Sequence, residues 1–267
     1  MEFDSGTDTL MVRIDDGGIG RLIFDNRDRH NALSVEMQAA LPAALAWLNG
    51  AESVQVIVVS GAGDKAFMSG ADISEFGSRP NSTDGGQTRI SSDAPAWGYW
   101  SDVTKPVVAM IGGYCIGAGL LVALRADIRI CSDDSTFGVP AARLGLGYGF
   151  PGVEALVQVT GISWASEILF SGRRLSAHEA LSAGLVNRVV TREELEPTVI
   201  DLAESIAGNA PLTLAALKAG LTQARLHPGR RDLSGVEALV RRCFESADFV
   251  EGQQAFLEKR RPRFTGR

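Results

Sequence analysis

Two segments of the chain share a pattern in which a short apolar run ends in small residues. The first covers residues 65–73 (KAFMSGADI) and the second covers residues 105–120 (KPVVAMIGGYCIGAGL). Small residues after a buried strand leave backbone N–H groups uncovered, and a helix that begins there adds positive potential. Two such loops placed side by side would direct a pair of donors at one oxygen atom. The pattern therefore predicts an oxyanion hole in an α/β protein.

The composition is that of a globular chain with a sizeable core. Of its 267 residues, 45% are hydrophobic and 22% are charged, which excludes a disordered protein and suits one large domain or a domain with an appendage. A net charge of −6 argues against a nucleic-acid partner. No run reaches the roughly 18 apolar residues of a membrane span, and the acidic N-terminus lacks an apolar stretch. Because Cys115, Cys131 and Cys243 have no paired spacing, we expect reduced thiols in a cytoplasmic protein.

Local patterns predict the main elements of the core. A Gly-rich turn predicts a β-hairpin over residues 11–24, and Ser34 is a candidate N-cap for a helix that ends near Leu48. Residues 77–95 predict a mobile loop, because they are rich in Gly, Ser, Pro, Asn and Asp. Apolar runs without alternation predict strands covered on both faces, at residues 55–59 and 107–111. Two further strands are expected at residues 127–131 and 186–190.

The chain divides into three parts on the same grounds. We expect a flexible tail over residues 1–9, an α/β core over residues 10–192 and a helical region over residues 193–267. The alternation of short strands and helices, taken alone, favours a doubly wound sheet.

Six short motifs follow one another along nearly the whole chain. They are Asn31-Ala32-Leu33, Gly70-Ala71-Asp72-Ile73, Gly117-Ala118-Gly119, Asp127 with Phe137-Gly138 and Pro140, Ser176-Ala177 with Glu179 and Gly184-Leu185-Val186, and Glu251-Gly252 with Phe256 and Glu258-Lys259-Arg260. In this order and spacing they resemble the crotonase superfamily, the enoyl-CoA hydratase/isomerase family. The resemblance implies a crotonase-like spiral of ββα units and a helical C-terminal trimerisation region. We adopt this fold in place of the doubly wound sheet.

The resemblance implies an acyl-CoA thioester as the ligand and a lyase or isomerase of fatty acid metabolism. The thioester oxygen would accept hydrogen bonds from the N–H groups of Ala71 and Ala118, which stabilises a thioester enolate. Coenzyme A would enter as part of the substrate, with no separate cofactor and no metal, and the protein would assemble as a homotrimer or a dimer of trimers. The adenine end would lie along the backbone of Ala66, Phe67, Met68 and Ser69, with phosphate contacts from Arg27, Arg29 and Lys259.

Two positions depart from the pattern of the family's hydratases. Those enzymes use two glutamates to place and activate water, and the matching positions of this chain are Leu121 and Ala141. Neither side chain can transfer a proton, a contribution worth roughly 10²–10⁴-fold in rate. Two-glutamate hydration is therefore not expected, and the acyl group and the reaction type stay open.

Several residues could replace the missing carboxylates. Tyr148 lies in a loop that the family places against the acyl chain, where it would act as a proton donor or as an aromatic wall, since a phenol has an ordinary pKa near 10. Glu75 is a second candidate, whereas Asp72 is better explained as a structural or N-cap residue. Asp84 and Asp93 lie on the predicted mobile loop, from which they could reach the site.

The remaining motifs carry little chemistry. His30, His178 and His227 lack partners at metal or triad spacing and are expected at the surface. The glycines of residues 112–119 fit neither the dinucleotide fingerprint nor a P-loop. Two hypotheses therefore remain: an enzyme that stabilises a thioester enolate, and a non-catalytic acyl-CoA binding protein that keeps the scaffold without the chemistry.

Overall fold

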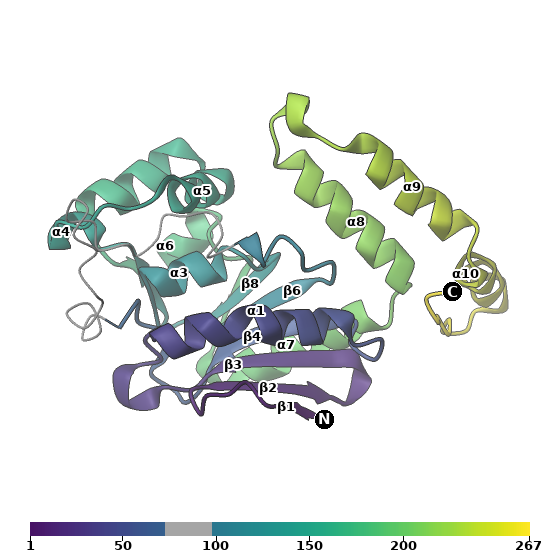
Figure 1. Ribbon diagram of the computed structural model, residues 1–267, viewed down its shortest axis with the longest axis horizontal. Coiled ribbons are helices and arrows are strands. Elements are labelled where there is room, and N and C mark those ends of the chain that lie inside the picture. The colour runs from purple at the N-terminus through teal and green to yellow at the C-terminus, as the bar shows by residue number, and fades with distance from the viewer. Residues whose placement is uncertain (73–97) are drawn as a thin grey trace.

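The computed structural model describes residues 1–72 and 98–267, which form two β-sheets with helices packed around them (Figure 1). The larger sheet has the strand order β1-β2-β3-β4-β6-β8-β11, and from β3 to β11 its strands run parallel. These strands are β1 (Glu2–Phe3), β2 (Leu10–Asp15), β3 (Ile19–Phe24), β4 (Val56–Gly61), β6 (Val107–Ile111), β8 (Ile128–Ser132) and β11 (Arg188–Val190).

The smaller sheet has the order β10-β9-β7-β5, with β5 at one edge. Its strands are β5 (Ala66–Met68), β7 (Tyr114–Ile116), β9 (Thr136–Gly138) and β10 (Leu175–Ser176). Each of the strands β4, β6 and β8 of the larger sheet is followed in the chain by a strand of the smaller one. A doubly wound protein would place all of these strands in one sheet, so this alternation confirms the crotonase-like spiral.

The larger sheet is covered on both faces, as its apolar strands predict. Val56 and Val58 of β4 pack against Leu195 and Val199 of α7. The alternate residues of β4 belong to the main core with helix α1, whose N-cap Ser34 accepts a hydrogen bond from the N–H of Met37. The helices are α1 (Val35–Gly50), α3 (Ala118–Ala123), α4 (Ala141–Leu144), α5 (Phe150–Ser171), α6 (Ala177–Ser182), α7 (Arg192–Ala207), α8 (Pro211–Ala224), α9 (Leu233–Phe244) and α10 (Ala247–Glu258).

The C-terminal helices α8, α9 and α10 extend away from the sheets (Figure 1). Helix α8 is joined to the core by an ion pair of 2.6 Å between Lys218 Nζ and Asp127 Oδ2. Since α7 packs in the core and the extension starts only at α8, the boundary expected at residue 193 falls within the core.

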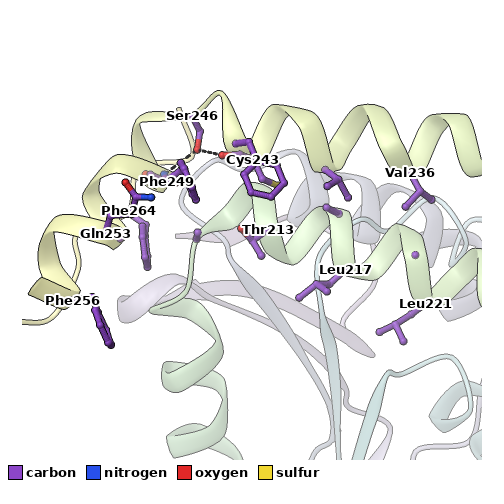
Figure 2. A pocket seen from close by; sticks show the side chains of 17 residues that line it. Thr213, Leu217, Leu221, Val236, Cys243, Ser246, Phe249, Gln253, Phe256 and Phe264 are labelled. Atoms are coloured by element: carbon purple, nitrogen blue, oxygen red, sulfur yellow. Dashed lines mark hydrogen bonds between the residues drawn. The ribbon is translucent and has the colours of Figure 1, made fainter.

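Helices α8 to α10 and the C-terminal segment enclose an apolar groove of about 890 Å³. Figure 2 shows Leu217 and Leu221 of α8 in this groove with Phe256 of α10, and these side chains are largely exposed.

The start of the chain differs from the flexible tail expected there. Residues 2 and 3 form strand β1, which pairs antiparallel with β2. The N–H of Ile14 donates to the carbonyl of Met1 at 2.7 Å. Strand β2 would otherwise leave its outer N–H and C=O groups unpaired at the sheet edge, and the first residues satisfy them.

The loop predicted over residues 77–95 lies outside the described residues. No helix of the described ranges is long and apolar enough to span a membrane.

We expect Gly119→Ala to lower the free energy of unfolding by about 2–3 kcal/mol. A Cβ at this position would lie 2.2 Å from the carbonyl oxygen of Met68, so α3 would have to move away from β5. Gly50→Ala is the matched control, because Gly50 is also helical and a Cβ there meets no atom within 4 Å. Urea denaturation of the two variants measures the difference, and equal stabilities would contradict this packing.

Candidate functional site

The first of the two loops follows β5 and is fixed by a bridge to Leu33. The N–H of Leu33 donates to the carbonyl of Gly70 at 2.8 Å, and the N–H of Asp72 donates to the carbonyl of Leu33 at 3.1 Å. Gly70 has a φ of 127°, which a residue with a side chain rarely adopts. The N–H of Ala71 lies between these bonded groups and has no hydrogen-bond partner among the described residues. It is therefore a fixed, available donor.

Asn31, two residues before Leu33, links the segment after β3 to backbone at the end of β4 and the start of β5. Its side-chain oxygen accepts from the N–H of Asn26 at 3.0 Å, and its Nδ2 donates to the carbonyls of Ala62 and Ala66 at 2.9 and 2.7 Å. Asn31 is 1% exposed and has a φ of 57°. Asparagine tolerates this left-handed conformation better than most residues. The first motif of the sequence analysis thus has a structural role in holding the loop.

The second loop follows β7 and leads into α3. Gly117 has φ 57° and ψ −114°, a combination accessible only to glycine. Its N–H donates to the carbonyl of Gly138 at 2.8 Å, and its carbonyl accepts from the N–H of Leu121 at 3.1 Å. The N–H of Ala118, the first residue of α3, has no hydrogen-bond partner within the described ranges. A Cβ on Gly117 would lie 3.8 Å from the Cα of Gly70, so the two loops are in contact.

Both unpaired N–H groups belong to residues that line one cavity of about 560 Å³. The cavity is bounded by the two loops, by α3 and α4, by the start of α5 and by the residues that follow α8. It brings together five positions that the sequence analysis singled out: Ala71, Ala118, Leu121, Ala141 and Tyr148. Helix α3 has only six residues, so the local N–H groups, rather than a long helix dipole, supply the positive potential.

Comparison with known proteins identifies the family. A family profile described as enoyl-CoA hydratase/isomerase matches residues 15–267. The chain belongs to the enoyl-CoA hydratase/isomerase family. The carnitinyl-CoA dehydratase of Proteus mirabilis (strain HI4320) is 34% identical over 262 residues, which cover 94% of this chain and 96% of that protein. The carnitinyl-CoA dehydratase of Salmonella typhi is 33% identical over 261 residues, or 93% and 96% of the two chains.

Solved structures agree with this assignment. An enoyl-CoA hydratase/carnithine racemase from Magnetospirillum magneticum has a TM-score of 0.88 and 32% identity, covering 98% of this chain and 97% of its own. A Geobacillus kaustophilus HTA426 structure described as enoyl-CoA hydratase subunit I has a TM-score of 0.85 and 34% identity, with coverage of 97% and 98%. The family and the fold expected from the motifs are therefore confirmed.

Tyr148 is packed against the start of α5. A Cβ on Gly152 would lie 2.7 Å from Cε1 of the ring, so only glycine allows this approach. The hydroxyl is buried and has no hydrogen-bond partner among the residues described. Burial raises the pKa of Tyr148 to about 12, so the phenol stays protonated at neutral pH. In this crotonase Tyr148 lines the cavity, and its protonated hydroxyl is not a base at neutral pH.

Several polar residues of the cavity were missed by the sequence analysis. They are Arg125 after α3, Glu154 and Gln158 of α5, and Arg225 after α8. Arg125 stands four residues after Leu121, a spacing that places both on one side of a helix. This spacing could have been used to predict Arg125 as a cavity residue. Glu154, Gln158 and Arg225 carry no local signal, because the fold alone brings α5 and α8 to this cavity. His227, expected at the surface, is exposed and lines the cavity.

The residues expected to bind coenzyme A are only partly brought together. Residues 66–68 are buried, so β5 offers only backbone at the sheet edge. Beside it, the short helix η2 (Arg27–Arg29) places Arg27 against Asp25 and Arg29 against Asp72, and Ser69 Oγ donates to the carbonyl of Arg29 at 3.1 Å.

Lys259, the remaining predicted phosphate contact, is not found at this site. Lys259 ends helix α10 in the C-terminal extension and does not line the cavity of its own chain. Glu75, Asp84 and Asp93 lie outside the described residues.

We expect Asn31→Ala to destabilise the fold by about 2–3 kcal/mol, because it removes the side-chain partner of three backbone groups. These groups are the N–H of Asn26 and the carbonyls of Ala62 and Ala66. Asn209→Ala is a suitable control, since Asn209 is exposed and its side chain donates, within the described part of the chain, only to the carbonyl of Ser205. Its effect should stay within about 0.5 kcal/mol. Chemical denaturation compares the two variants, and a loss for Asn31→Ala no larger than for the control would show that Asn31 does not hold the loop.

Proposed function

We propose that the protein binds an acyl-CoA thioester in this cavity and catalyses a reaction that passes through its enolate. The thioester oxygen accepts hydrogen bonds from the N–H groups of Ala71 and Ala118. The observation that carries the proposal is that two adjoining loops present unpaired backbone donors to one cavity. Because both donors are fixed by the backbone, they need no reorganisation as negative charge develops on the oxygen.

The arrangement of acid and base follows from the remaining lining residues. Leu121 and Ala141 cannot place or activate water, so the protein does not use two-glutamate hydration. Glu154 is the only carboxylate among the described residues that line the cavity. In our proposal Glu154 removes a proton from the acyl Cα, and the electron pair of the broken C–H bond passes to the thioester oxygen. Tyr148, protonated because of its raised pKa, donates a proton or forms the wall.

The alternative is an acyl-CoA binding protein without chemistry. Leu121 and Ala141 favour it, because they remove the proton-transfer groups of the hydratases. The donor pair of Ala71 and Ala118 favours an enzyme, since donors that act on a developing negative charge contribute most in a transition state. The alternative predicts binding without any exchange of Cα protons.

The acyl group differs, in our proposal, from that of the curated relatives. A carnitinyl group carries a quaternary ammonium, and in this chain Arg125 adds a positive charge to the cavity. Two like charges in one partly buried site repel each other. We therefore infer another acyl group, within a cytoplasmic lyase or isomerase.

The coenzyme moiety lies along β5 in this proposal, with Arg27 and Arg29 near its phosphates. Lys259 can join them only from a neighbouring copy, because it lies outside the cavity of its own chain. We propose a homotrimer or a dimer of trimers, in which the apolar groove of α8 to α10 is covered by a second copy.

The exchange of Cα protons of saturated acyl-CoAs in D₂O, followed by NMR, tests the enzyme without knowledge of its substrate. We expect the wild type to accelerate the exchange and Ala118→Pro to lower it by about 10²–10³-fold. Proline removes the N–H at a first helical position, where it fits the helix. Ala118→Ser keeps the N–H and should change the rate only a few fold. Binding of acyl-CoAs without exchange would favour the alternative, and the absence of binding would contradict both functions.

The same exchange assay separates the two proton-transfer candidates. Glu154→Gln removes the proposed base and should lower the rate by about 10²-fold or more, whereas Tyr148→Phe keeps the wall and should cost about tenfold or less. Acyl-CoA affinity should stay within a few fold in both. Glu193→Gln, an exposed change on α7, is the control. A larger loss in Tyr148→Phe than in Glu154→Gln would reverse these roles.

Light scattering tests the assembly. We expect a trimer, or a multiple of it, of the 28.3 kDa chain. Leu217→Glu should dissociate it, because Leu217 is 59% exposed in the groove and a charge there opposes burial. Leu181→Glu, at a residue of α6 that is 41% exposed and outside the groove, should leave the mass unchanged. A monomeric wild type at micromolar concentration would contradict the proposal.

A further inference from the structure

The cavity contains a positive charge that the fold does not neutralise. Arg125 lines the cavity, and its Nε is buried without a hydrogen-bond partner in the described ranges. Within the same ranges no ion pair and no side-chain hydrogen bond involves its guanidinium. A partly buried guanidinium without a partner is costly, because it loses water and gains no acceptor in return.

Two more deeply buried arginines of the described residues, Arg21 and Arg129, do have acceptors. Arg21 is 6% exposed and donates to Asp15 and Glu196 at 3.1 and 3.0 Å. Arg129 is 7% exposed and donates to the carbonyls of Leu185 and Ala126 at 2.7 and 2.6 Å. In both cases the fold supplies acceptors. The described residues supply no such acceptor to Arg125. Because Arg125 lines the cavity, a ligand bound there could supply it.

The surroundings of Arg125 favour an anion over a neutral group. Burial and the positive charge of Arg225 lower the pKa of Arg125. The two guanidinium groups therefore repel each other. Arg225 Nε donates to Gln158 Oε1 at 3.0 Å and carries its own charge toward the cavity. Tyr99, Tyr148 and Glu154 raise the pKa of Arg125. The two phenols, however, are neutral at pH 7, and Glu154 makes no ion pair with Arg125.

The position of Arg125 relates it to the acyl end of the ligand. Ala118, Leu121 and Arg125 lie at helical spacing along α3 and the turn that follows, and all three line the cavity. The rise from Ala118 to Arg125 is about 10 Å, and helical side chains lean back toward the N-terminus. A carboxylate bound by the guanidinium would therefore end an acyl chain of about four to six carbons in all, counted from the thioester carbonyl to the carboxylate carbon.

We propose that the substrate is an ω-carboxyacyl-CoA, whose distal carboxylate pairs with the Arg125 guanidinium while its thioester oxygen lies between Ala71 and Ala118. The inference rests on the proposed function and adds the substrate class. A carboxylate can accept two parallel N–H bonds from a guanidinium, and such pairs are among the stronger polar contacts in proteins. Arg225 adds positive potential to the same end of the cavity.

Isothermal titration of the wild-type protein with saturated acyl-CoAs tests the proposal. The probes are succinyl-, glutaryl- and adipyl-CoA, each compared with the neutral butyryl-, pentanoyl- or hexanoyl-CoA of equal carbon number. We expect at least one carboxylated probe to bind about tenfold or more tightly than its neutral counterpart. In Arg125→Met this affinity ratio should fall at least tenfold, and in Arg125→Lys it should fall less, because the charge remains. Arg188→Met, at an exposed arginine outside the cavity, should keep the ratio.

The outcomes separate this proposal from the function on which it rests. Neutral acyl-CoAs that bind as tightly as every carboxylated probe would overturn the carboxylate assignment and leave acyl-CoA binding intact. A preference that survives in Arg125→Met would overturn the role of Arg125. Should that variant fail to fold, the ratios of the wild type and of Arg125→Lys decide the question. The absence of binding by every probe would overturn the proposed function itself.

Discussion

The close approach of two backbone segments is the constraint on which the site depends. The carbonyl of Met68 at the end of β5 faces Gly119 of α3, where a Cβ would lie only 2.2 Å from its oxygen. Beside this contact, a Cβ on Gly117 would lie 3.8 Å from the Cα of Gly70, so the two loops run next to each other. A side chain at Gly119 would push α3 away from β5, whereas Gly70 and Gly117 are required by their backbone conformations, with φ of 127° and 57°. Tight packing between a strand and a short helix thus determines where the donors of the proposed oxyanion hole lie.

Around this rigid pair of loops the cavity combines opposite environments. Leu121 and Ala141 give an apolar surface near the donors, whereas Arg125, Glu154 and Arg225 bring charge to the same cavity. In our account the backbone donors stabilise the negative charge that develops on the thioester oxygen. The side chains select the acyl group and transfer the proton. This division is consistent with a family in which one scaffold serves several reactions.

The sequence predicted the elements whose signals are local. The hairpin of β2 and β3, helix α1 after Ser34 and strand β6 follow from turn residues, an N-cap and a short apolar run, and the structure confirms them. Apolar runs do not indicate to which of two sheets a strand belongs, so the spiral came only from the resemblance. The pairing of β1 with β2 was missed because a two-residue edge strand has no periodicity.

The sequence predicted the two loops of the candidate site but not its charged lining. Glycines and small residues marked both loops in the sequence, because their backbone requirement is local. The charged lining was not predicted, since Glu154 and Arg225 reach the cavity only through the packing of α5 and α8. Lys259 shows the converse: a charge inside a family motif lies away from the cavity of its own chain.

The vibrational frequency of the bound thioester carbonyl tests the central claim most directly. Infrared difference spectra of butyryl-CoA with ¹²C and ¹³C at this carbonyl isolate its stretching band in the complex with the wild-type protein. Two backbone donors directed at the oxygen would polarise the C=O bond, so we predict a band at lower frequency than for the free thioester in water. A bound carbonyl that absorbs at or above the frequency of the free thioester would show that Ala71 and Ala118 do not form an oxyanion hole.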